Sequence, residues 1–147
     1  MRNGRNFYMP IEIDDIVLNK AAIIERSLRR VLEEYRMDPT LTQYTHIDAL
    51  TLNIERACQA AIDLAIHLCA VNRLGIPQTS AEAFRILAKN NKISQATAQK
   101  MVAMVGFRNI AIHEYQMMDM AILRSIAEEG WQSLVLYLSE LGVHIKP

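Results

Sequence analysis

The chain has 147 residues, a formal net charge of zero and a hydrophobic content of 51%. This length suits a single domain, and the apolar content argues against long disordered stretches. No apolar run approaches the ~18 residues of a membrane span, and the N-terminus lacks the apolar core of a signal peptide, so we expect no membrane partner. Zero net charge argues against a protein that tracks long stretches of nucleic acid.

The chain contains two cysteines, Cys58 and Cys69, in one predicted helix. At a rise of ~1.5 Å per residue their backbones lie ~16 Å apart, which is too far for a disulfide between them. Two buried free thiols fit a reducing compartment, so we expect a cytoplasmic protein.

Charge is distributed unevenly along the chain. No acidic residue occurs between Ala83 and His113, and acidic residues predominate after His113. The same acid-free stretch holds the basic residues Arg85, Lys89, Lys92, Lys100 and Arg108. The pattern predicts either a local basic surface or an ordinary solvated helix face, and the sequence leaves both open.

Residues 1–10 show no hydrophobic period, so we expect a loose basic lead-in before a single helical domain over residues 11–147. The first helix is predicted from Asp14 to Tyr35, because aspartate suits an N-cap and apolar residues follow at helical spacing. Asp38 and the proline after it end this helix. Its expected core stripe is Ile16, Ile23, Ile24, Leu28, Val31, Leu32 and Tyr35. Its expected solvated face is Arg26, Arg29, Arg30, Glu33 and Glu34.

The second helix is predicted over residues 46–73 and is ended by Gly75 and Pro77. Asp63 and His67 lie four positions apart and can hold each other. With no third ligand evident, we predict no metal site there. These residues belong to a polar stripe formed by Asn53, Arg56, Asp63 and His67.

Helix-starting signals also mark the second half of the chain. A capping box at Thr79 opens a short third helix, and Ser94 caps a fourth whose methionines are expected in the core. Gly106 in the fourth helix suggests close packing of another backbone. The last helix is predicted over residues 120–141, with a bend at Gly130.

These patterns predict an all-α fold, an up-down bundle of four main helices plus one short helix. The last helix is rich in apolar side chains for a bundle of this size. We therefore expect a homodimer. The apolar residues concerned include Trp131, Leu134, Tyr137 and Leu138.

The richest chemistry lies in residues 108–115, which we call the motif segment. It brings Arg108, Asn109, His113 and Tyr115 into eight consecutive positions. Arginine can bind two phosphate oxygens, and histidine can move a proton on or off a ribose 2′-hydroxyl near neutral pH. On a helix Arg108 and His113 flank one groove that suits a phosphodiester without a metal ion. Arg-x4-His alone is a weak pattern, and a polar seam inside a bundle is the alternative.

From about residue 11 to the last helix the chain resembles the HepT branch of the HEPN superfamily. The motif segment matches the Arg-x4-His-x-Tyr signature of that superfamily. The residues just before it, 104–107, resemble the same branch, as do residues 52–58 with 62–65 and residues 74–77. Several separated matches in the right order are more specific than the signature alone.

The resemblance implies the toxin of a toxin–antitoxin pair, a dimeric ribonuclease that uses no metal and lines one cleft with the Arg and His of both protomers. By this resemblance Arg108 binds the scissile phosphate and His113 is the general base or acid. Asn109 then helps to orient the phosphate or the imidazole. From the polar stripe we add that Asp63 orients Arg108.

The resemblance also implies regulation through Tyr115. The implied partner of the toxin is a minimal nucleotidyltransferase of the MntA type. This partner uses ATP and Mg²⁺ to transfer AMP onto Tyr115, which silences the toxin. The chain itself needs no cofactor. An AMP group would put bulk and negative charge beside Arg108, where RNA phosphate binds.

Two other interpretations stay open. The chain can be a non-catalytic helical dimer that binds nucleotide or RNA, with Tyr115 only a substrate of the partner. It can also be a purely structural helical dimer.

Overall fold

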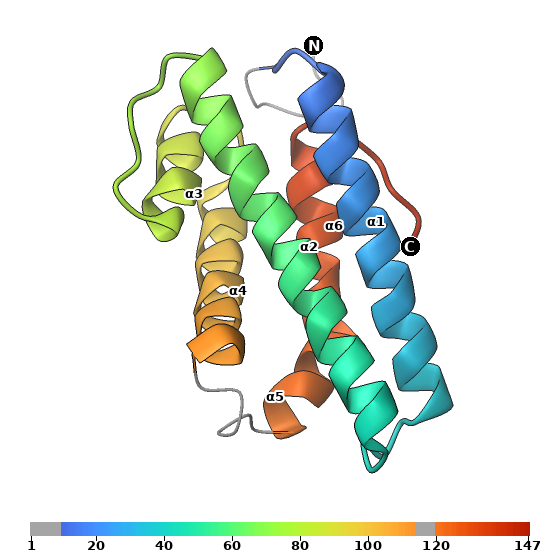
Figure 1. Ribbon diagram of the computed structural model, residues 1–147. Coiled ribbons are helices and arrows are strands. Elements are labelled where there is room, and N and C mark those ends of the chain that lie inside the picture. The colour runs from blue at the N-terminus through green and yellow to red at the C-terminus, as the bar shows by residue number, and fades with distance from the viewer. Residues whose placement is uncertain (1–9, 114–119) are drawn as a thin grey trace.

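In the computed structural model all regular structure of the described residues is helical (Figure 1). The description covers residues 10–113 and 120–147, without the side chains of residues 108, 109 and 111–113. The elements are α1 (Asp15–Met37), α2 (Tyr44–Val71), α3 (Ser80–Lys89), α4 (Gln95–His113), α5 (Met120–Ser125), a π-helical turn (Ile126–Gly130) and α6 (Trp131–Glu140). The predicted lead-in lies outside the described residues except for Pro10.

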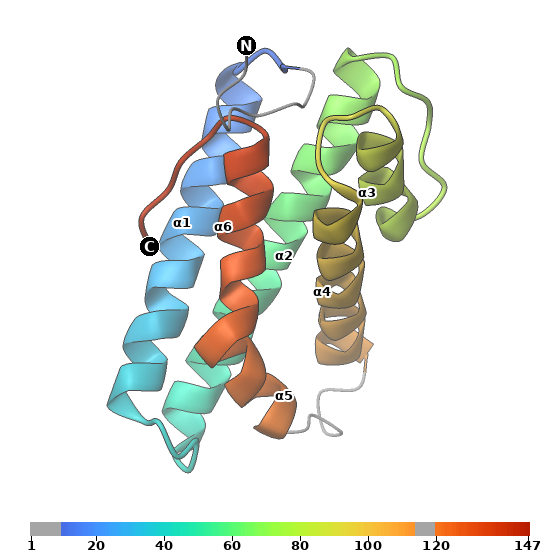
Figure 2. The same ribbon diagram turned by 180° about the vertical axis from the view of Figure 1, so that it is seen from behind.

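The main helices run up and down beside one another, as predicted (Figure 1). From behind, α6 lies between α1 and α4 (Figure 2). Apolar side chains from all of the long helices meet in one hydrophobic core. Its largest fully buried members include Tyr137, Phe84, Ile24, Leu28, Leu50 and Met101. The predicted all-α bundle with one short helix, α3, is therefore confirmed, while its division from a lead-in stays a prediction.

The beginning of α1 is set by Asp14, as predicted. Its carboxylate accepts a hydrogen bond from the backbone N–H of Val17 at 2.9 Å. The core stripe is rotated slightly from the predicted one: Val17 and Ala21 are buried, whereas Ile16 is 46% exposed. Neighbouring helix positions differ by about 100° in direction. The spacing of apolar residues alone therefore does not decide whether Ile16 or Val17 faces the core.

Asp38 joins the end of α1 to the start of α2. Its carboxylate accepts hydrogen bonds from the backbone N–H groups of Thr42 at 3.1 Å and Gln43 at 2.9 Å. These N–H groups hold the pKa of Asp38 below its ordinary value, the Gln43 bond having the largest effect. Asp38 thus ends the first helix, as predicted, and also fixes the turn into the second.

Three side-chain pairs tie α1 to α2 along their length. His67 lies 2.7 Å from Asp14. Lys20 donates to Asp63 at 3.3 Å, and His46 lies 3.3 Å from Glu34. Glu34 is therefore buried, contrary to its predicted place on the solvated face.

The end of α2 comes earlier than predicted, at Val71. Arg73, with φ 54°, is the left-handed residue that closes this end, ahead of Gly75. The backbone N–H of Leu74 then donates to the carbonyl of Cys69 at 2.9 Å. A non-glycine residue in this role is less common, which is why the sequence favoured the glycine.

The last predicted helix is divided into α5, a π-helical turn at Ile126–Gly130 and α6, with α5 set at an angle to α6 (Figure 2). The bend predicted at Gly130 thus falls at the end of that turn. Within α6, the buried hydroxyl of Tyr137 donates to the carbonyl of Ala61 at 3.0 Å. The helix closes at Gly142, with φ 96°, as predicted.

The prediction for the two cysteines is confirmed. Cys58 and Cys69 are free and buried. Burial raises the pKa of the Cys69 thiol. Within the described ranges no helix combines the length and the apolar character that a bilayer span requires.

Candidate functional site

The motif segment begins on the last turns of α4. Arg108, Asn109 and His113 occupy helical positions there, as expected. Tyr115 lies outside the described residues, so its predicted role is untested by geometry. The roles of the other three also stay predictions, because their side chains are not described.

The N-terminal end of α4 is anchored by a carboxylate from α6. Glu140 accepts hydrogen bonds from the backbone N–H of Ser94 at 2.8 Å and from the hydroxyl of Thr97 at 2.9 Å. The hydroxyl of Ser94 also accepts from the backbone N–H of Thr97 at 3.0 Å, so the predicted cap is confirmed. Because a helix is stiff, this anchor helps to set the position of the motif segment at the other end.

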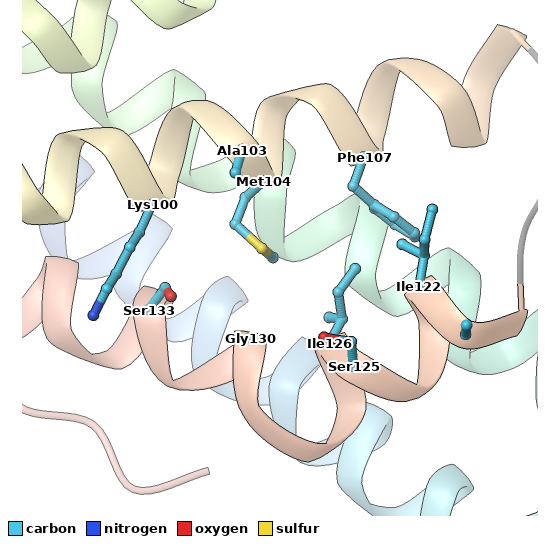
Figure 3. A pocket seen from close by; sticks show the side chains of 10 residues that line it. Lys100, Ala103, Met104, Phe107, Ile122, Ser125, Ile126, Gly130 and Ser133 are labelled. Atoms are coloured by element: carbon cyan, nitrogen blue, oxygen red, sulfur yellow. The ribbon is translucent and has the colours of Figure 1, made fainter.

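One flank of α4 opens into a groove of about 410 Å³, which we call the α4–α5 groove (Figure 3). Phe107 and Met104 of α4 face Ile122 of α5 and Ile126 of the π-helical turn across it. The complete lining is Lys100, Ala103, Met104, Phe107, Ala121, Ile122, Ser125, Ile126, Gly130 and Ser133. This mostly apolar hollow lies between α5 and α4, the helix that carries the start of the motif segment.

The groove continues along α6 into a more polar hollow of about 740 Å³. Both hollows share Lys100, whose side chain extends toward the helix of Ser133 (Figure 3). The second hollow also presents Glu128 and Glu129 from the π-helical turn. The surface of this flank is therefore apolar close to the motif segment, and it is charged farther from the motif segment, along α6.

The polar stripe of α2 does not act as one unit. Asn53 is buried and donates to the carbonyl of Ala49 at 2.8 Å, while Arg56 is exposed. The other two members of the stripe have separate partners at α1: Asp63 binds Lys20, and His67 binds Asp14. The predicted contact between Asp63 and His67 is therefore absent, since helix α1 competes for both groups.

Asp63 has one described partner on α1 and one on α2 itself. One carboxylate oxygen accepts from Lys20 and the other accepts from the amide of Gln59 at 2.7 Å. These contacts give no support to an orienting role toward Arg108, which stays a prediction. Across the described ranges no cluster of three or more potential metal ligands occurs.

Gly106 differs from its predicted role. It is exposed, and no described atom lies within 4 Å of the position that a Cβ would take. The glycine therefore leaves a bare stretch of helix two residues before the motif segment, with no backbone of another element packed on it within the described chain.

Two of the side-chain contacts described above were not predicted from the sequence. Glu140 lies at the far end of the chain from Ser94, and Lys20 lies on a different helix from Asp63. Only a cap signal at Ser94 was readable, because its partner depends on how α6 packs. A coevolving pair in related sequences is the signal that could reveal such contacts.

Comparison with known proteins places this helical domain in a family. A family model described as ribonuclease HepT-like matches residues 22–141. The mRNA nuclease HepT of Shewanella oneidensis is 38% identical over 117 residues, which cover 79% of this chain and 88% of the relative.

Solved structures agree with the sequence match. A toxin–antitoxin complex with AMP-PNP has a chain that matches with a TM-score of 0.83 and 33% identity, covering 88% of this chain and 98% of that one. The tri-AMPylated HEPN toxin of Shewanella oneidensis, in complex with its MNT antitoxin, gives a TM-score of 0.83 at 34% identity with the same coverage. The recognition made from the motif segment is thereby confirmed, and the chain belongs to the HepT-like family.

Proposed function

We propose that the chain is the toxin of a toxin–antitoxin system and cleaves RNA. The observation that carries this proposal is the motif segment at the end of α4 in a chain that matches the HepT-like family along residues 22–141. A relative covering most of this length is an mRNA nuclease. We place the activity in the cytoplasm, where its RNA substrate is found.

Arg108 and His113 divide the chemistry in this proposal. Arg108 binds the non-bridging oxygens of the scissile phosphate and stabilises the charge that builds on them. His113 takes the proton of the ribose 2′-hydroxyl as the 2′-oxygen attacks phosphorus and the bond to the 5′-oxygen breaks. Asn109, four positions before His113, orients the phosphate or the imidazole. The products are a 2′,3′-cyclic phosphate and a 5′-hydroxyl end.

A second copy of the chain completes the site. The leaving 5′-oxygen needs a proton, and one histidine cannot supply it while taking another. In a homodimer the other protomer brings its own Arg108 and His113 into the cleft. The α4–α5 groove supports this proposal, because Phe107, Met104 and Ile122 form an apolar surface beside the motif segment.

Tyr115 is the proposed point of control. Its phenolic oxygen attacks the α-phosphorus of ATP in a partner nucleotidyltransferase of the MntA type, and pyrophosphate leaves. The related HEPN toxin bound to an MNT antitoxin is tri-AMPylated, which supports this route. The chain needs no cofactor of its own, and ATP with Mg²⁺ serves the partner. The attached phosphate then competes with RNA for Arg108.

The catalytic proposal is tested with His113→Ala and a matched histidine variant. His144 is exposed near the C-terminus, so His144→Ala is the control. Wild type and His144→Ala should arrest growth in a host without the antitoxin and should cut RNA in EDTA to cyclic-phosphate ends. His113→Ala should lose about 10²-fold or more of this cleavage. Equal cleavage by the His113→Ala and wild-type proteins would contradict the catalytic role.

The control by Tyr115 is tested by mass spectrometry. Incubation with the partner transferase, ATP and magnesium should add AMP to the peptide that contains Tyr115 and should abolish cleavage. Tyr115→Phe should stay unmodified and toxic. If wild type gains AMP but never cleaves RNA, the non-catalytic alternative replaces the nuclease proposal.

A further inference from the structure

The other flank of α4 carries a second, smaller groove, which we call the α3–α4 groove. It lies where α3 packs beside α4 (Figure 1) and has a volume of about 250 Å³. Arg85 of α3 faces Gln95 and Gln99 of α4 across it. Ala98 and Val102 complete its lining. Cationic and amide side chains therefore line a hollow that differs in chemistry from the apolar α4–α5 groove.

Arg85 lines this groove, Lys89 lies on α3 outside the lining, and neither cation has a partner among the described residues. Arg85 is exposed, and Lys89 is exposed one turn later on the same face of α3. Neither forms an ion pair or hydrogen bond within the described part of the chain. The nearest carboxylate along α3 is that of Glu82, which accepts from the backbone N–H of Gln78 at 3.2 Å. One uncompensated cation in the groove and a second one turn along α3 make this part of the surface suitable for an anionic ligand.

The face of α4 that lines this groove leads directly to the motif segment. At 100° per residue, positions 95, 99, 102, 106, 109 and 113 fall within about 40° of one direction. Gly106 lies in the middle of this face, where it leaves the backbone bare. A ligand can therefore follow the helix surface from Gln99 to position 113 without meeting a side chain at position 106.

The length of this face suits a polymer. The fourteen steps along the helix from Gln99 to His113 span about 21 Å at a rise of ~1.5 Å. Stacked nucleotides rise about 3.4 Å each, so roughly six fit along it. A phosphodiester chain combines this reach with the regularly spaced negative charges that Arg85 and Lys89 would bind.

We propose that the α3–α4 groove and the adjoining face of α4 bind single-stranded RNA leading to the scissile bond. Arg85 and Lys89 bind backbone phosphates, and Gln95 and Gln99 form hydrogen bonds with sugars or base edges. This inference rests on the proposed ribonuclease function and adds where the substrate lies. It assigns Arg85 and Lys89 of the basic stretch noted in the sequence to substrate binding, whereas Lys92 is buried and Lys100 lines the α4–α5 groove.

The experiment removes the two cations together. Arg85→Gln with Lys89→Gln is compared with Arg26→Gln with Arg36→Gln, a pair of exposed arginines on α1 with the same loss of charge. Binding is measured by fluorescence anisotropy with a short labelled single-stranded RNA whose 2′-oxygens are methylated, so that it cannot be cut. The titration is repeated between about 50 and 200 mM salt.

Removal of Arg85 and Lys89 should weaken RNA binding by at least about tenfold and should make the log–log salt slope shallower by about 1.4, or about 0.7 per lost phosphate contact. The α1 pair should change neither quantity to this extent. Arg85→Lys with Lys89→Arg should restore most of the affinity, since both cations are kept. Equal affinities and slopes for the two glutamine pairs would overturn the proposal.

Two further measurements separate this inference from other outcomes. If the variant without Arg85 and Lys89 keeps its RNA affinity but no longer binds the transferase, the face docks the antitoxin and the RNA proposal is wrong. His113→Ala should bind the methylated RNA like wild type. Loss of cleavage in His113→Ala, with unchanged RNA binding in the groove variant, would leave the nuclease function standing and remove only the RNA path.

Discussion

The α1–α2 hairpin and helix α4 are held in the bundle in opposite ways. Side-chain pairs tie α1 to α2 near both ends and in the middle, through Asp14, Lys20 and Glu34. Helix α4, by contrast, has its described polar ties to another element only at its first turn, through Glu140. Below that turn it packs through apolar residues and has a groove on each flank.

This difference separates support from function. The α1–α2 hairpin is a rigid support, or wall, held by side-chain pairs. Helix α4 carries the start of the motif segment and has open surface on both flanks. A ligand or a second protomer needs such open surface in order to bind. The hairpin, which only supports the fold, can be fully packed without any effect on binding. The polar residues of α2 that looked functional in the sequence belong mostly to the wall, because His67 and Asp63 pair with α1.

The largest effect on this contrast is expected from Glu140→Ala. The change leaves the backbone N–H of Ser94 and the buried hydroxyl of Thr97 without their acceptor, at a cost on the order of 2 kcal/mol in the free energy of unfolding. Because Glu140 positions α4, RNA cleavage per folded molecule should also fall. Urea unfolding and cleavage assays measure the two effects.

Tyr137→Phe is the matched control on the scaffold side. It removes one buried hydrogen bond to Ala61, which should cost about 1 kcal/mol in unfolding free energy and leave cleavage per folded molecule unchanged. Equal loss of specific cleavage in the Glu140 and Tyr137 variants would mean that α4 is no more sensitive than the rest of the bundle.

A smaller effect is expected from Gly106→Ala. The added methyl group meets open space in the chain, and alanine favours a helix over glycine by about 0.5–1 kcal/mol, so the melting temperature should rise. Ala103→Gly, at another exposed position of α4, should lower it by a similar amount. A rise in stability combined with weaker RNA binding would sharpen the assignment of this face. A fall in stability would contradict the openness of position 106.

The smallest effect at neutral pH comes from the acids of the hairpin. Two hydrogen bonds contribute most to lowering the pKa of Asp14: the one from the backbone N–H of Val17 has the larger effect, and the one with His67 comes second. The backbone N–H of Gln43 lowers the pKa of Asp38. Groups with a lowered folded-state pKa add stability above their ordinary pKa of ~3.9 and lose it as pH falls through the lowered value.

We therefore expect stability to decline between about pH 5 and pH 2, with the hairpin losing amide-exchange protection early. Asp38→Asn should lower stability at neutral pH and flatten this decline. An unchanged pH profile in that variant would show that Asp38 does not link the hairpin to acid unfolding.

Much of the fold was readable from local signals. The helix starts were predicted correctly at Asp14, Thr79 and Ser94. An N-cap side chain binds a backbone N–H only three residues further on, so the signal is local in the sequence. The exposure of Ile16 and the early end at Val71 were not readable, because a neighbouring helix decides the rotation of a stripe and Arg73 takes a conformation more usual for glycine.

The candidate site was readable only in part. The motif segment was predicted on the fourth helix, where positions 108–113 lie. Neither groove beside it was predicted, since each depends on how α3 or α5 packs against α4. The predicted partner of Asp63, His67, was wrong because Asp63 accepts from Gln59 on its own helix and from Lys20 on α1 instead.

The burial of both thiols makes this chain convenient for spectroscopy. Cys58 is 1% exposed and Cys69 is fully buried, so maleimide reagents should react slowly with the native protein. A single Gln99→Cys substitution would then place one dye in the α3–α4 groove against a silent background. Energy transfer from that dye to labelled RNA could follow substrate arrival on α4 without removing either native cysteine.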